Sequence, residues 1–294
     1  MKNRNGFTLI ELSIVLVIIG LIVGGVLVGQ DLIKAAQIRA TVGQLEKYNT
    51  AVNTFHNKYN GIPGDLVNPL RFFPNITDST GTLGNAGQGD GNDLVESISA
   101  ANTLCANDDC VSGEAALFWY ELAQANLIPD NITNADMGNV SFDPTAATSS
   151  AMPAAKIGKG NYITVNASEG MVGSTGLNYF VIWAIRSGSE LNGFPNGTTG
   201  LTPIEAYQID VKIDDGLPGS GTVLAVGFPP SVGPPITTWA LAPGGLIAGF
   251  PQCYNTTPSP AVYSTATNIV GTGASAGIHA YSTPLCNLSI RANF

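Results

Sequence analysis

Residues 12–29 read LSIVLVIIGLIVGGVLVG, and no charged side chain interrupts them. An α-helix rises about 1.5 Å per residue, so about 18 to 20 such residues span the hydrocarbon layer of a membrane. An ordinary secretory signal has a shorter apolar region that ends at a cleavage site of small residues. The run does not stop at such a site, so it predicts a helix that stays attached and can cross a membrane.

The helical pattern continues beyond the apolar run, with no proline before Pro63. Apolar residues recur at three- and four-residue steps: Ile38, Val42, Leu45, Val52, Phe55 and Tyr59. Polar residues fall on other faces: Gln37, Arg39, Gln44, Glu46, Lys47 and Asn53. The sequence therefore predicts one helix over about residues 8–58, roughly 75 Å long, whose second half is amphipathic.

The rest of the chain is poor in charge and rich in residues that break helices. Charged residues make up 11% of the 294, whereas there are 35 glycines and 18 prolines, which predicts strands, turns and loops with few helices. The length allows one substantial core or two small ones. Residues 60–294 carry 18 acidic and 6 basic side chains, a net charge of −12. Such a globule does not suit phosphate backbones, so we expect no nucleic-acid partner.

The four cysteines are Cys105, Cys110, Cys253 and Cys286. Their even number and the lack of a Cys-x-x-Cys motif argue against a zinc site. Two disulfides in an oxidising compartment fit better. Of three possible connectivities we favour Cys105 with Cys110 and Cys253 with Cys286, because shorter loops close most easily.

Glu11 is a carboxylate at the edge of the apolar run. An ionisable group in a membrane-spanning segment is costly and by default indicates a function. The alternative is that Glu11 lies in the headgroup region. It follows a short basic leader, Met1-Lys-Asn-Arg-Asn-Gly6, and Phe7. A basic leader that ends in glycine, then phenylalanine, then glutamate four residues on and a hydrophobic helix, resembles the class III signal of type IV pilins and of the pseudopilins of type II secretion.

The resemblance implies that prepilin peptidase cleaves between Gly6 and Phe7 and methylates the new amino group of Phe7. It also implies that Glu11 pairs with the N-terminal amine of a neighbouring subunit as the subunit enters a filament. This pairing is physically reasonable, because two charges carried into an apolar helical bundle must neutralise one another.

The resemblance also implies an organisation of the chain and a location. Residues 1–6 would be a leader, residues 7–60 the long helix, membrane-spanning to about residue 29, and residues 61–294 a periplasmic or extracellular head. The protein would be a single-pass protein of the bacterial inner membrane with a short cytoplasmic N-terminus, reaching the cell surface after filament assembly. Its partners would be other pilin or pseudopilin subunits, prepilin peptidase, an inner-membrane assembly platform and the lipid bilayer.

The head is expected to have an α+β fold. Gly61, Pro63 and Gly64 are expected to end the long helix. Residues 74–113 are expected to form a long loop. Residues 113–127 are expected to form a second helix with Ser112 as its N-cap. Its apolar residues are expected in the core: Leu117, Phe118, Trp119 and Leu122. Candidate strands of an antiparallel sheet occupy residues 162–165, 178–185, 206–213 and 222–228, whereas residues 244–294 have a loop-like composition. The family resemblance places this sheet against the upper half of the long helix.

Enzymatic chemistry is not expected. The sequence Gly273-Ala-Ser-Ala-Gly277 matches a nucleophile elbow and His279 follows it, but no acidic residue lies after Asp215 to complete the order of that triad. His56 on the long helix is interpreted as a packing or surface residue. No cofactor is expected. Two oxygen-rich loops are candidates for calcium binding: Asp90-Gly-Asn-Asp93, and Asp210 with Asp214-Asp215-Gly216. The turn-forming residues of both loops explain their composition without a metal.

The leading interpretation is a structural subunit of a type IV pilus or a type II secretion pseudopilus. The alternative is a minor pilin that acts as an adhesin or binding tip, because the head is larger than polymer building requires. A weaker alternative is a membrane-anchored periplasmic enzyme, which the shortage of clustered histidines, cysteines and acids opposes.

Overall fold

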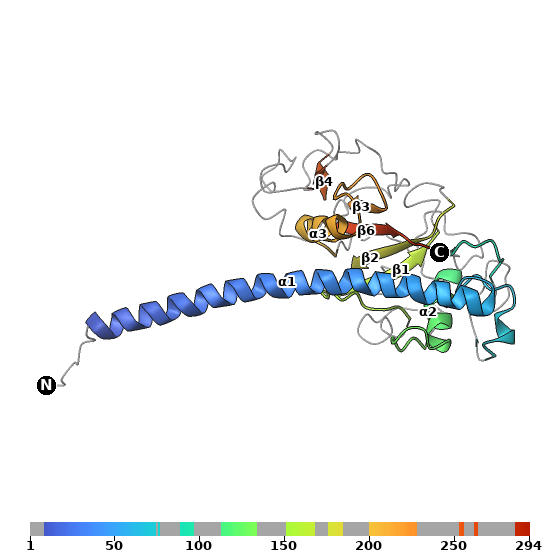
Figure 1. The fold of residues 1–294 in the computed structure, drawn as a ribbon, viewed down its shortest axis with the longest axis horizontal. Helices are drawn as coiled ribbons and strands as arrows, with labels where there is room; N and C mark the ends of the chain where they lie inside the picture. The colour runs from blue at the N-terminus through green and yellow to red at the C-terminus, as the bar shows by residue number, and fades with distance from the viewer. Residues whose placement is uncertain are drawn as a thin grey trace, which may run out of the picture.

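The computed structural model describes residues 9–74, 76, 89–96, 113–133, 151–167, 176–184, 200–227, 253–255, 262–263 and 286–294. One long helix projects from a head that packs on the C-terminal half of that helix (Figure 1). The predicted α+β arrangement is therefore confirmed, with a long N-terminal helix, shorter helices and an antiparallel sheet.

The long helix α1 covers Leu9–Tyr59 without a break, within one residue of the predicted bounds. Its buried residues lie in the second half: Ile38, Thr41, Gln44, Leu45, Tyr48, Ala51, Val52 and Phe55. Asn60 ends the helix with a positive φ of 58°, and its backbone N–H donates to the carbonyl of His56. An asparagine in the left-handed conformation is a common helix terminator. The 3₁₀ turn η1, Pro69–Arg71, follows.

The main sheet has the strand order β1-β2-β6-β3, and all neighbouring strands are antiparallel. Its strands are β1 (Asn161–Asn166), β2 (Tyr179–Ala184), β3 (Val223–Gly227) and β6 (Cys286–Arg291). The short strands β4 (Tyr254–Asn255) and β5 (Val262–Tyr263) form a separate antiparallel pair. Three of the four predicted strands are thus present, as β1, β2 and β3.

The core lies where α1, α2 and the sheet meet. The helix α2, Glu114–Gln124, ends three residues before the predicted end. Its N-cap is Gly113, which has no side chain to form a cap, and the predicted N-cap Ser112 lies outside the described residues. Trp119 of α2 packs edge-on against Tyr48 of α1 and stacks on Phe180 of β2. The four apolar α2 residues expected in the core are all fully buried, which confirms their assignment.

The predicted strand over residues 206–213 is wrong, because this segment belongs to the helix α3, Pro203–Ile213. Thr202 and Glu205 form a capping box and Pro203 occupies the first turn, and both are signals for a helix start. The burial also follows a helical period: Ala206, Ile209 and Asp210 are buried, whereas Val211 is exposed. Ile209, Val211 and Ile213 alternate with polar residues in the sequence, and this alternation, which predicts a strand, occurs here within a helix.

The predicted loop over residues 244–294 is wrong at its end, because β6 pairs with β2 on one side and with β3 on the other. Residues on both of its faces are buried, including Asn287 and Ser289 as well as Leu288 and Ile290. The last strand of the chain is therefore an interior strand of the sheet.

Candidate functional site

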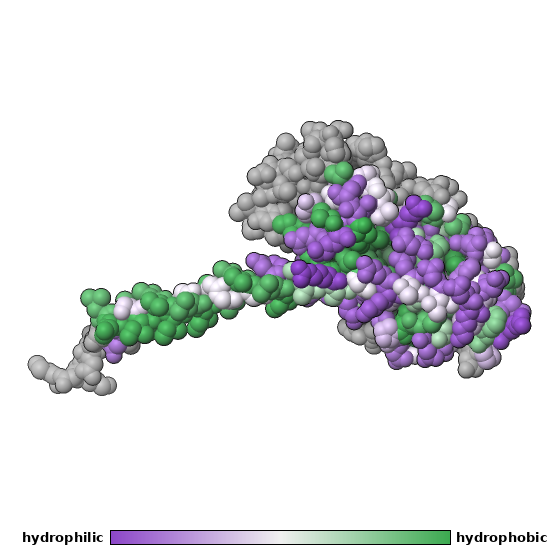
Figure 2. All heavy atoms as spheres, viewed as in Figure 1, coloured by the Kyte–Doolittle hydropathy of each residue, from purple (hydrophilic) through white to green (hydrophobic). Residues whose placement is uncertain are grey.

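The first half of α1 is an apolar helix that stands clear of the head. Its large hydrophobic side chains are exposed from Leu9 to Ile33, with Leu9 87% and Leu21 73% exposed. The most apolar window of 18 residues has a mean hydropathy of 2.9, and none of it is buried inside the protein. Hydrophobic residues cover this projecting part (Figure 2). The helix is long and apolar enough to cross a membrane.

Glu11 lies in the first turn of α1, and its side chain is exposed among apolar neighbours. A carboxylate in the first turn interacts favourably with the positive end of the helix dipole. Gly6 and Phe7 lie outside the described residues, and so does the bond between them that is predicted to be cleaved.

A buried polar network joins α1 to the head. The side-chain amide of Gln44 donates to the Tyr48 hydroxyl (2.8 Å) and to the Ala154 carbonyl (2.9 Å), and its Oε1 accepts from the Lys156 N–H (2.9 Å). The Tyr48 hydroxyl donates to Asp130 (3.1 Å), and burial, followed by the charge of Asp130, raises the pKa of Tyr48 above its ordinary value. The prediction that Gln44 lies on a polar face is wrong, because it faces the head and is only 7% exposed.

The C-terminus of the chain also contacts α1. The Asn293 N–H donates to the side chain of Asn49 (2.9 Å), and the ring of Phe294 packs against Phe118 and Phe180. The second half of α1 is thereby held both by the segment around Ala154 and by the end of β6. The head and this part of α1 consequently form one packed unit.

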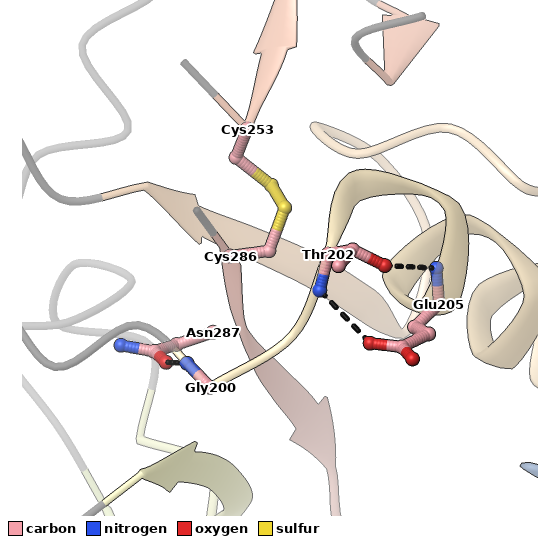
Figure 3. Close-up of a disulfide and its surroundings, with 6 residues drawn as sticks. All are labelled: Gly200, Thr202, Glu205, Cys253, Cys286 and Asn287. Carbon is pink, nitrogen blue, oxygen red and sulfur yellow. Dashed lines mark hydrogen bonds between the residues drawn. A yellow bond between two sulfur atoms is a disulfide. The ribbon is translucent and has the colours of Figure 1, made fainter. Parts of the chain in front are cut away.

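A disulfide joins Cys253 to Cys286, with the two Cα atoms 5.0 Å apart. Cys286 begins β6, and its backbone also forms an isolated β-bridge with Leu201. Figure 3 shows the disulfide beside the capping box of α3, formed by Thr202 and Glu205. Next to the disulfide, the Asn287 side chain accepts from the Gly200 N–H (3.2 Å). The disulfide therefore attaches the segment that contains β4 to the place where α3 and β6 begin. Cys105 and Cys110 lie outside the described residues.

Two carboxylates hold the segment 89–96 against the end of α1. Asp65 accepts from the N–H groups of Gly91 (2.5 Å) and Asp93 (2.7 Å). Glu114 accepts from those of Asp90 (3.3 Å) and Glu96 (2.9 Å). The sequence indicated this segment only as an oxygen-rich loop, because the accepting side chains lie 18 to 28 residues away from it.

Glu121 lies near these two carboxylates and accepts from the Gly64 N–H (2.8 Å). Burial, and then the charges of Asp65 and Glu114, raise the pKa of Glu121 to about 8. Burial likewise raises the pKa of Asp65 to about 6, although its bonds to Gly91 and Asp93 oppose the shift. Gly64 has a φ of +86°, and a Cβ atom there would lie 2.3 Å from the Glu114 carbonyl oxygen, so only glycine fits this close approach.

The second oxygen-rich loop is the turn between α3 and β3, where carboxylate oxygens of Asp210, Asp214 and Asp215 lie within 4.8 Å of one another. Asp210 accepts from the Gly216 N–H, Asp215 from the Leu217 N–H and the Ser220 hydroxyl, and Asp214 from the Thr222 and Val223 N–H groups. Each carboxylate therefore has a role in the turn itself.

The residues weighed for enzymatic chemistry form no site in the described part of the chain. His56, interpreted as a packing or surface residue, is exposed on α1 and is therefore a surface residue. Residues 273–277 and His279 lie outside the described residues.

Residues 1–27 match a family model described as the prokaryotic N-terminal methylation motif. This motif is the class III signal of type IV pilins and pseudopilins, which confirms the resemblance based on Gly6, Phe7 and Glu11. The match supports a pilin-like or pseudopilin-like prepilin, a structural type of protein. No curated protein and no solved structure matches the chain.

Proposed function

We propose that the protein is a structural subunit of a type IV pilus or of a type II secretion pseudopilus. The observation that carries this proposal is a methylation motif that leads directly into one unbroken helix with two environments. The first half of that helix is apolar and exposed, and the second half is packed into the head. Such a helix can be held in a membrane and later packed against copies of itself without any change in the head.

In this proposal prepilin peptidase cleaves between Gly6 and Phe7 and methylates Phe7, and the head lies on the periplasmic side. Lys2 and Arg4 favour a cytoplasmic N-terminus, and the disulfide between Cys253 and Cys286 suits an oxidising compartment. Lys34 and Arg39 beyond the apolar run oppose the charge rule, so the orientation rests mainly on the motif and the disulfide.

The proposal is tested by mass spectrometry of the protein purified from cells with and without an active prepilin peptidase. With the peptidase, the mature chain should begin at N-methylated Phe7, and without it the chain should retain Met1. Replacement of Gly6 by alanine is a milder variant that should slow cleavage while the head folds normally. An intact Met1 terminus in cells with the active peptidase would contradict the proposal.

A further inference from the structure

The large exposed hydrophobic side chains of the described head fall into two groups. The first group lies in and around η1, and the second lies on α3. The first, called the η1 patch below, consists of Val67, Leu70 and Phe72, and the second, the α3 patch, consists of Ile204, Tyr207 and Val211. Groups of exposed hydrophobic side chains are typical of surfaces that bind another protein.

The α3 patch has an acidic edge. Its three residues are spaced three and four apart, so they lie on one face of α3, and each is between 45% and 49% exposed. Ala206 and Ile209, on the other face, are buried. In the turn that follows, Asp215 is exposed and Asp214 is partly exposed, and Lys212 is the nearest basic residue in the sequence. The patch therefore combines an apolar face with two carboxylates at its C-terminal end.

The η1 patch has a basic edge. The ring of Phe72 packs against that of Tyr59, the last residue of α1, with the ring centroids 5.0 Å apart. A cation lies over each of these rings: Lys58 Nζ is 4.9 Å from the centroid of Tyr59, and the guanidinium of Arg71 is 5.5 Å from that of Phe72. Lys58 and Arg71 are both exposed. Aromatic rings and arginine are enriched at the centres of protein interfaces.

Charge favours a second copy of the chain as the partner. Residues 60–294 carry 18 acidic and 6 basic side chains, so most surfaces of two heads repel one another. Lys58 and Arg71 make the η1 patch a place where an acidic surface of another copy is attracted. The acidic segment 89–96 approaches this patch at Val67, so the attraction acts on the side of the aromatic rings. The α3 patch offers the apolar face and the carboxylates that match it.

The positions of the two patches determine what a contact between them builds. The α3 patch lies where the apolar half of α1 leaves the head, because α3 contacts α1 there (Figure 1). The η1 patch lies at the other end of the head, beside Tyr59. Residues 38–59 of α1, which pack in the head, extend about 30 Å. A contact between two different patches is heterologous, and with such a displacement along α1 it repeats in a line instead of closing into a dimer.

We propose that the η1 patch of one subunit binds the α3 patch of the next, so that the heads stack end to end along the filament. The apolar side chains of the two patches pack together, while Lys58 and Arg71 face the turn that contains Asp214 and Asp215. The contact rests on the proposed function, because it requires copies aligned in a filament. It adds a contact made by the heads to the one made by the apolar halves of α1.

The test crosslinks the full chain within filaments sheared from cells. Leu70→Cys and Val211→Cys are introduced together, and a short bismaleimide joins cysteines that lie close to one another. Both positions are exposed, so the head should fold normally. The double variant should give a ladder of dimers, trimers and longer chains on a denaturing gel, because each copy is joined to two neighbours. Each single variant should remain monomeric, and so should the matched pair of Leu70→Cys with Glu46→Cys, since Glu46 is exposed outside both patches.

Charge reversal gives an independent readout. Arg71→Glu and Asp215→Arg should each lower the yield of sheared filaments about tenfold, because like charges then face one another across the contact. The two changes combined should restore most of the yield, since the charges are opposite again. Asp215 also accepts hydrogen bonds within its own turn, and a loss of those bonds could not be rescued by a change at Arg71. The rescue therefore separates the contact from local folding, and its failure would contradict the proposal.

The outcomes distinguish this contact from the proposed function. If wild-type filaments form from subunits that begin at methylated Phe7 but the double cysteine variant gives no ladder, the contact is overturned and the proposed function stands. Dimers from Leu70→Cys alone would show a two-fold contact and would also overturn it. Protection of Val211→Cys from the reagent without any crosslink to Leu70→Cys would show that lipid or another surface covers α3. If wild-type cells form no filaments, the proposed function is wrong and the contact with it.

Discussion

Gln44 is an amide buried between α1 and the head, and both ends of its side chain are bonded to the chain around residues 154–156. A buried hydrogen-bonding group is costly to leave without a partner, so the amide fixes the register of the head along the helix. A purely apolar contact would tolerate a shift along α1 more easily, because apolar packing is not directional.

We therefore predict that Gln44→Met destabilises the head. Methionine fills a similar volume but leaves the Lys156 N–H and the Ala154 carbonyl without their partner, at a cost of about 2–3 kcal/mol. The free energy of unfolding should be measured with denaturant on the full chain in micelles. Lys47→Met places the same residue on the exposed face of α1, one turn away, and should change stability by less than about 0.5 kcal/mol. Equal stability of the two variants would contradict the prediction.

The role of Gln44 could not be predicted from the sequence for a physical reason. Helical periodicity identifies a face by its apolar residues, and Gln44 is polar although it lies beside Leu45 and Tyr48 in the buried set. Its partners are 110 and 112 residues away, so no local pattern indicates them. The same holds for Glu114 and Glu121, which are fully buried acids at ordinary-looking helix positions.

At the scale of elements, α1 could be predicted almost to the residue, because its apolar run, its repeat and its breakers all agree. For α3, a strand-like alternation over residues 206–213 conflicted with the cap at Thr202, the proline at 203 and Glu205. The cap was the better evidence, since it satisfies backbone N–H groups that a strand would leave to a neighbour. β6 has few β-branched residues, and its place in the sheet comes from pairing on both sides with β2 and β3.

Because β6 depends on long-range pairing, we expect the disulfide at its first residue to matter for stability. Replacing both Cys253 and Cys286 by alanine removes a cross-link between residues 33 apart, which should lower the free energy of unfolding by about 4 kcal/mol in the loop-entropy description. Denaturant unfolding of the full chain under non-reducing conditions measures this loss.

Ser289→Ala is a control on the same strand. The Ser289 hydroxyl is buried and has no hydrogen-bond partner among the described residues, so its removal should be neutral or slightly stabilising. If the double cysteine variant were as stable as Ser289→Ala, the disulfide would not support β6.

At the scale of the whole molecule, one helix connects two very different solvents. Its second half shares a core with the sheet and α2, whereas its first half contributes no residue to that core and exposes a continuous hydrophobic surface. Water disfavours such a surface strongly, so in the proposed function lipid covers it before assembly and other helices cover it afterwards. Glu11 lies at the tip of this surface, so in the proposed function it passes from one environment to the other.

We predict that Glu11→Ala leaves cleavage after Gly6 intact but lowers filament assembly by roughly a hundredfold. The carboxylate should neutralise the amine of Phe7 on a neighbouring subunit, and an amine left alone in an apolar bundle costs about 3–5 kcal/mol, which outweighs the gain from removing one charge. Cleavage is read from the mass of the mature chain, and assembly from the filaments sheared from cells. Glu46→Ala is the matched control, because Glu46 is an exposed glutamate on the same helix but beside the head. Normal filament yield from Glu11→Ala, or an equal loss from Glu46→Ala, would show that the contact between subunits does not depend on this charge.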